Sequence, residues 1–155
     1  MRHPVLRSVF TLSVPVAMLG FGCSSPPPAA NSFTEVYAKV IAPTCSTDFC
    51  HYSGVGIRYG ALDLSSQVTA YYSLVGQPCA GASCSEMGTR VVPGDPGNSI
   101  MYLKVSKAMP PCGSQMPADE ATLRASGTST FSGTPLSSDQ QQLIYNWIAD
   151  GAQNN

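Results

Sequence analysis

The sequence predicts a small, mostly α-helical domain with long irregular loops. Capped segments with the apolar spacing of a helix lie near both ends of the chain, and no strand-like alternation extends beyond a few residues. Glycine and proline are numerous, and charged residues make up only 11% of the chain. This composition favours a loop-rich domain outside the cytoplasm, where the six cysteines would be bonded or modified.

The N-terminus is expected to be an export signal. Residues 1–22 combine a basic start with an uncharged apolar run too short to span a bilayer, and Cys23 follows directly. This pattern resembles a bacterial lipoprotein signal, which implies a lipid on Cys23 and a periplasmic or outer-membrane lipoprotein; simple cleavage and release is the alternative. Residues 23–31 would then form the lipidated N-terminus and a proline-rich linker, and residues 32–155 the domain.

The domain is expected to open with a helix. Ser32 can cap it, and Glu35 stands where it would complete a capping box. Its apolar face consists of Phe33, Val36, Tyr37, Val40 and Ile41. Pro43 is expected to end this helix at about Ala42.

Two shorter helices are expected in the middle of the chain. Ser65 or Ser66 can cap the first, and Gly76 stops it. Its apolar residues are Val68, Tyr71, Tyr72 and Val75. After a double turn at residues 93–98, Ser99 is expected to cap the second.

The last helix has the strongest signals in the chain. Ser137 is the cap, Gln140 lies three residues later, and Gly151 provides the stop. Leu143, Ile144, Trp147 and Ile148 form one apolar stripe. We therefore expect this helix to pack against the first one.

A cysteine pair followed by histidine is the main chemical motif. Cys45, Cys50 and His51 provide two thiols that can add to the vinyl groups of a haem and an imidazole that can bind its iron. The two cysteines are separated by four residues rather than the usual two. Two other interpretations remain open at this point. Cys45 and Cys50 could form a disulfide, or a zinc site could be completed by one of the remaining cysteines, Cys79, Cys84 and Cys112.

Methionine is the expected second ligand of such an iron, because His51 is the only histidine beyond the leader. Two methionines lie in the proline-containing segment at residues 109–117, and each precedes a proline. Met116 is preferred and Met109 is the alternative.

The chain resembles small monohaem c-type cytochrome domains of bacterial secreted proteins and lipoproteins. The residues that carry the resemblance are Cys45, Cys50-His51, Gly60-Ala61-Leu62-Asp63-Leu64, Val92-Pro93-Gly94-Asp95-Pro96, Ser99, Met116-Pro117, Leu136-Ser137, Leu143-Ile144, Trp147-Ile148 and Gly151-Ala152. The resemblance implies a cytochrome c-like fold whose terminal helices cross. It also implies haem c attached through Cys45 and Cys50, with His51 as proximal and Met116 as distal iron ligand.

Three further cysteines cannot all pair with one another. A disulfide between Cys84 and Cys112 is preferred, because it would join the segment before the double turn to the methionine loop. Cys79 is the alternative partner.

The expected function is electron transfer through one haem, not enzymatic catalysis, although a small peroxidase using an open iron position is a further possibility. The alternative is a haem-free structural or interaction lipoprotein whose cysteines form disulfides. Redox proteins are the expected partners, and a lipid anchor would hold the domain at a membrane. Nucleic acid is not expected as a partner, because the net charge is −1 and no basic cluster occurs.

Overall fold

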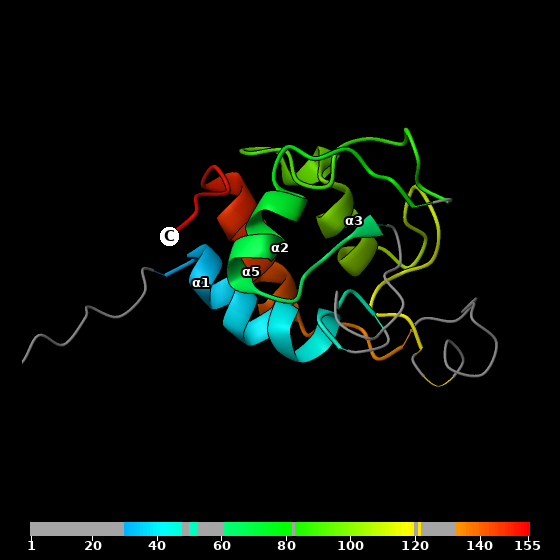
Figure 1. Ribbon diagram of the computed structural model, residues 1–155, viewed down its shortest axis with the longest axis horizontal. Coiled ribbons are helices and arrows are strands. Elements are labelled where there is room, and N and C mark those ends of the chain that lie inside the picture. Colours follow the sequence, from blue (N-terminus) through cyan, green and yellow to red (C-terminus); the bar gives the residue numbers. More distant parts are fainter. Residues whose placement is uncertain (1–29, 48–49, 53–60, 82, 120, 122–132) are drawn as a thin grey trace, which may run out of the picture.

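The computed structural model describes residues 30–47, 50–52, 61–81, 83–119, 121 and 133–155, and this part of the chain is mostly helical (Figure 1). Its elements are α1 (Phe33–Val36), the π-helix η1 (Tyr37–Cys45), α2 (Gln67–Leu74), the 3-10 helix η3 (Pro96–Asn98), α3 (Ile100–Ser106) and α5 (Ser138–Ala149). Isolated β-bridges occur among these residues, but no strand does. The expectation of a mostly α domain with long loops is confirmed.

The start of α1 contains half of the expected capping box. The Ser32 hydroxyl accepts from the Glu35 N–H at 3.2 Å. The Glu35 carboxylate pairs with the Lys39 ammonium at 2.7 Å, four residues further along the helix. This ion pair is the main cause of the lowered pKa of Glu35.

The expected end of the first helix at Ala42 is wrong. The chain continues as η1 through Pro43 to Cys45. The Ser46 N–H donates to the carbonyl of Ile41 at 2.9 Å, which is the five-residue spacing of a π-helix. Proline ends an α-helix because it lacks an N–H and collides with the carbonyl four residues before it. In the wider π turn the bonds run to the fifth residue, so the helix reaches Cys45.

The second helix begins as expected, but its buried face differs from the expected one. Ser66 caps α2 by accepting from the Thr69 N–H at 3.1 Å. Ala70 and Leu74 are buried in the core. Val68 and Tyr72 are about two-thirds exposed, so their assignment to the packed face is wrong.

The terminal helices pack on each other, as expected. The ring of Phe33 in α1 lies 4.9 Å from that of Trp147 in α5. The C-terminal segment returns to α1, where the Thr34 N–H donates to the Asn155 backbone oxygen at 2.9 Å. Figure 1 shows this segment beside α1 and shows α2 in front of α5.

The main core draws residues from both ends and from the middle of the described chain. Its buried members are Phe33, Val36, Val40, Ile41, Leu64, Ala70, Leu74, Val91, Val105, Leu136, Ile144, Trp147, Ile148 and Ala152. Burial of these side chains is the dominant stabilising contribution. Because η1 is part of this core, its last residue, Cys45, has a fixed position.

Candidate functional site

The two ends of the Cys45 to His51 motif meet in a closed turn. The His51 N–H donates to the Cys45 carbonyl at 3.1 Å, and the Cys50 N–H donates to the Thr47 carbonyl at 2.9 Å. The His51 carbonyl accepts from the Leu64 N–H at 2.7 Å, which ties the turn to the core. The backbone therefore places both cysteines and the histidine at the end of η1 despite the four-residue spacing.

The sulfurs of Cys45 and Cys50 are both thiols. They are not bonded to each other, and each side chain is half-buried. Burial, with a smaller electrostatic contribution from Cys50, raises the pKa of Cys45 to about 12. Cys45 is therefore protonated at neutral pH.

Polar atoms around this turn are enclosed. The Nδ1 atom of His51 is buried. The Oγ1 atom of Thr47 is also buried, and it has no hydrogen-bond partner within the described residues. A buried polar atom without a partner is uncommon and is consistent with a further group at this site. The donor set of the turn, two thiols and an imidazole, is the one that covalent haem attachment requires.

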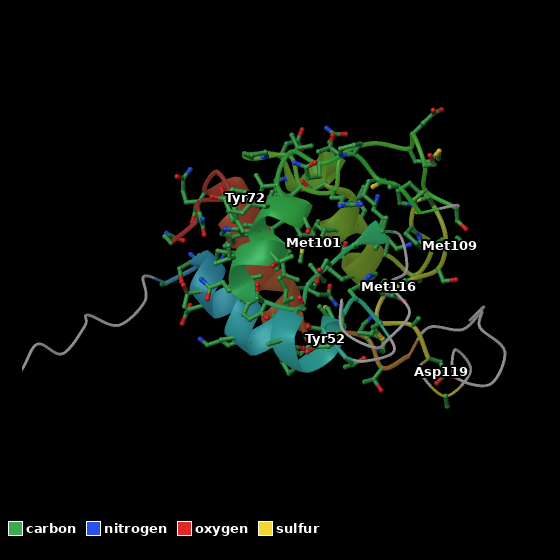
Figure 2. All side chains as sticks on the ribbon, viewed as in Figure 1. Tyr52, Tyr72, Met101, Met109, Met116 and Asp119 are labelled. Atoms are coloured by element: carbon green, nitrogen blue, oxygen red, sulfur yellow. A yellow bond between two sulfur atoms is a disulfide. The ribbon has the colours of Figure 1, made fainter. Side chains whose placement is uncertain are left out.

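The two candidate methionines differ in position. Met116 is half-buried and packs against the main core, as Cys45 does. Met109 is 89% exposed. Figure 2 shows Met109 on the outer loop and Met116 nearer the helices. Of the two, only Met116 shares the core against which the cysteine-histidine turn packs.

Sequence reasoning missed two residues of α3 that bear on this comparison. Met101 in α3 is half-buried and packs against the same core. Lys104, also in α3, hydrogen-bonds the segment that carries Met116. The expected short helix after Ser99 contained both residues, but no local signal indicated the contacts of Lys104.

The aromatic residues belong mainly to the core. Trp147 is buried, and its indole N–H donates to the Gln153 carbonyl at 2.9 Å. The Tyr71 hydroxyl donates to the Ala152 carbonyl at 3.0 Å. These bonds satisfy the polar ends of the rings where they pack.

The three other cysteines form a second, smaller cluster. Cys84 and Cys112 are joined by a disulfide, with their Cα atoms 5.2 Å apart. Cys79 is a buried thiol in the same cluster as this disulfide, and burial raises its pKa. The zinc interpretation gains no support, because Cys84 and Cys112 are bonded to each other and no cluster of metal-binding side chains occurs within the described residues.

Several expected features lie outside the described residues. These are the export signal, the lipidation site Cys23 and most of the linker. In the part that is described, no helix is long and apolar enough to cross a membrane. Comparison of the chain with family models, curated proteins and solved structures finds no match.

Proposed function

We propose that this protein transfers electrons through one haem c attached to Cys45 and Cys50. The observation that carries the proposal is the closed turn at the end of η1. Its backbone hydrogen bonds hold Cys45, Cys50 and His51 in one turn. The two cysteines are unbonded thiols, and His51 is the only histidine beyond the leader. We further propose a cytochrome c-like arrangement of the helices, supported by the contact between the terminal helices.

Each residue of the site has a distinct task in this proposal. Cys45 and Cys50 hold the porphyrin through thioether bonds, and His51 provides the proximal imidazole. Met116 provides the distal thioether, a ligand that raises the reduction potential. The haem supplies a single-electron couple between ferrous and ferric iron.

The membrane anchor is part of the same proposal. A lipid on Cys23, followed by the proline-rich linker, would hold the domain near membrane-bound electron donors and acceptors. The partners would be redox proteins. Their recognition requires no substrate pocket, since the exposed edge of a haem suffices for electron transfer.

The absorption spectrum of the purified protein tests the proposal. The protein is expressed in cells that contain haem-maturation machinery and is then treated with acidified acetone, which removes haem that is not covalently bound. We expect a Soret band that stays with the protein, and a mass increased by one haem. A colourless protein whose mass is lower by the hydrogens of disulfides would instead establish the haem-free lipoprotein.

The choice of distal ligand gives a first testable prediction. Met116→Ala should remove the red charge-transfer band of methionine-ligated ferric haem, because it deletes the proposed sulfur ligand. Met109→Ala is the matched control and should leave the band intact, since Met109 is 89% exposed. Optical spectra of both oxidised variants decide the point. Retention of the band in Met116→Ala would show that another residue binds the iron, whereas absence of the band in both wild type and variant would favour an open iron position and peroxidase chemistry.

A further inference from the structure

We infer that Lys104 is a positioning residue that holds the Met116 thioether in place for the iron. This inference rests on the proposed function, because it concerns the proposed distal ligand. Lys104 lies in α3, and the segment from Cys112 to Met116 passes beside it. The Met116 N–H donates to the Lys104 carbonyl at 2.8 Å. The Lys104 ammonium donates to the Cys112 carbonyl at 2.9 Å. One residue thus binds both ends of this five-residue segment.

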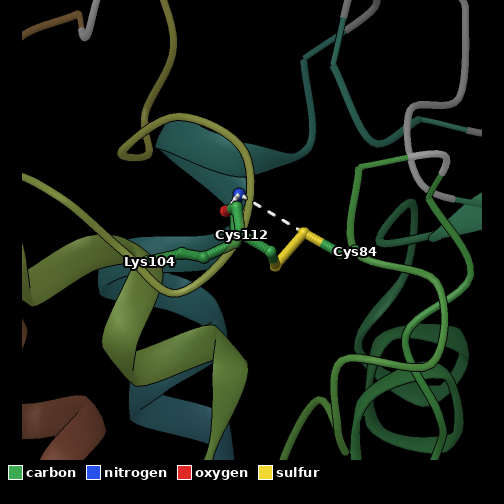
Figure 3. Close-up of a disulfide and its surroundings, with 3 residues drawn as sticks. All are labelled: Cys84, Lys104 and Cys112. Carbon is green, nitrogen blue, oxygen red and sulfur yellow. Dashed lines mark hydrogen bonds between the residues drawn. A yellow bond between two sulfur atoms is a disulfide. The ribbon is translucent and has the colours of Figure 1, made fainter.

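The ammonium of Lys104 is enclosed by the disulfide, the Cys112 carbonyl and Gly113. The side chain is half-buried, and Nζ lies 3.9 Å from the Cys84 sulfur of the disulfide (Figure 3). Gly113 has a φ of +58°, and a Cβ there would lie 3.0 Å from the same Nζ. The segment therefore passes close to the ammonium at a residue without a side chain. Burial also lowers the pKa of Lys104, as expected for an enclosed cation.

The disulfide is a second restraint on the same segment. It joins Cys112 to Cys84, so the segment that begins at Cys112 is held covalently at one end. At the other end, the Met116 N–H is held by the backbone carbonyl of Lys104. A ligand on a restrained segment loses less conformational entropy when it binds than one on a free loop. The disulfide and Lys104 together, called the clamp below, should therefore favour Met116 over other ligands that compete for the iron.

A lysine suits this position better than an apolar residue of similar length. Burying an ammonium is costly unless it is hydrogen-bonded, and the Cys112 carbonyl compensates for that cost. The stem of the side chain could be replaced by that of methionine with little change in packing. Lys104→Met therefore removes the donor while it keeps most of the volume.

The first experiment measures competition for the iron. Imidazole is titrated into the ferric protein and into Lys104→Met, and the loss of the methionine charge-transfer band is followed. We expect imidazole to bind about tenfold more tightly to the variant, the size of effect that loss of one charge-assisted hydrogen bond produces. Lys107→Met, which changes an exposed lysine at the end of α3, should bind imidazole as the wild type does. Equal affinity in all three proteins would overturn the inference.

The second experiment does not depend on the haem spectrum. Hydrogen exchange at the Met116 amide should be faster in Lys104→Met, because losing the bond from the ammonium to the Cys112 carbonyl loosens the segment, even though the Lys104 backbone carbonyl still accepts from Met116. Exchange at the Ile144 amide in α5 should stay slow, which separates local loosening from global unfolding. Unchanged exchange at Met116 would show that the Lys104 side chain does not restrain the segment.

A second variant guards against misfolding of the first. Gly113→Ala places a methyl group against the same ammonium and should change both measurements in the same direction. A wild-type protein without haem would overturn the proposed function and, with it, the role of Lys104 in iron ligation. In that case the exchange experiment would still show whether the clamp exists.

Discussion

At the scale of single residues, Ser99 shows how one hydroxyl can fix a turn. Its side chain was expected to cap α3, but it makes no such bond, and that expectation is wrong. The hydroxyl donates to the Asp95 carbonyl at 2.8 Å and accepts from the Val92 N–H at 2.8 Å. Ser99 is fully buried, so these bonds are shielded from water. The residue holds the double turn closed beneath the core.

Replacing Ser99 should therefore destabilise the fold. Ser99→Ala leaves the partly buried Val92 N–H and Asp95 carbonyl without this partner, and we expect a loss of about 1–2 kcal/mol in the free energy of unfolding. Urea denaturation followed by circular dichroism measures the loss. Ser138→Ala, at an exposed position, should change stability little. Similar midpoints for the two variants would contradict the role given to Ser99.

At the scale of elements, the ends of the helices are determined in different ways. The start of α5 follows a local code, because Ser137 and Gln140 form a complete capping box. The end of η1 does not, since Pro43 lies inside the helix. Local capping can be read from neighbouring residues, whereas the π conformation accompanies the packing of Val40 and Ile41 in the core.

The capping box gives a prediction at this scale. Ser137→Ala removes the oxygen that accepts from the Gln140 N–H at 3.2 Å, and the free energy of unfolding should fall by about 1 kcal/mol. Differential scanning calorimetry would register this as a lower Tm. Ser137→Asp restores an acceptor at the positive end of the helix and should recover the stability. Failure of the aspartate to do so would argue against capping as the cause.

At the scale of the whole molecule, distant segments are joined by a few specific bonds. The Asn155 side chain and backbone oxygen accept from the N–H groups of Phe33 and Thr34, so the C-terminal residues cover the first turn of α1. The Arg90 guanidinium donates to the Ser73 carbonyl at 2.7 Å near the end of α2. These bonds tie helices α1 and α2 to segments that are distant from them in the sequence.

The disulfide gives the prediction for the whole molecule. It closes a sequence separation of 28 residues, for which the restriction of the unfolded chain predicts a stabilisation of about 3–4 kcal/mol. The double variant Cys84→Ser/Cys112→Ser should lose most of this in chemical denaturation. Cys79→Ser, which leaves the disulfide in place, should lose clearly less. Equal losses would mean that packing around these cysteines, rather than the covalent link, stabilises the fold.

The helical character of the chain, the caps at Ser66 and Ser137, and the contact between the terminal helices could all be predicted from the sequence. Each depends on neighbouring residues or on the periodicity of apolar ones, which are properties of short segments. The cysteine-histidine motif could also be recognised from the sequence, because its residues are close together in the chain.

The tertiary structure alone decided which side chains are enclosed and which segments are tied together. In the folded chain, Val68 and Tyr72 are exposed, and Met116 rather than Met109 packs against the core. Lys104 is hydrogen-bonded to the segment that carries Met116. Burial and hydrogen bonds between distant segments depend on how the whole chain packs, and no short pattern encodes them. The sequence therefore determined the helices and the candidate ligands, and the packing of the chain determined their surroundings.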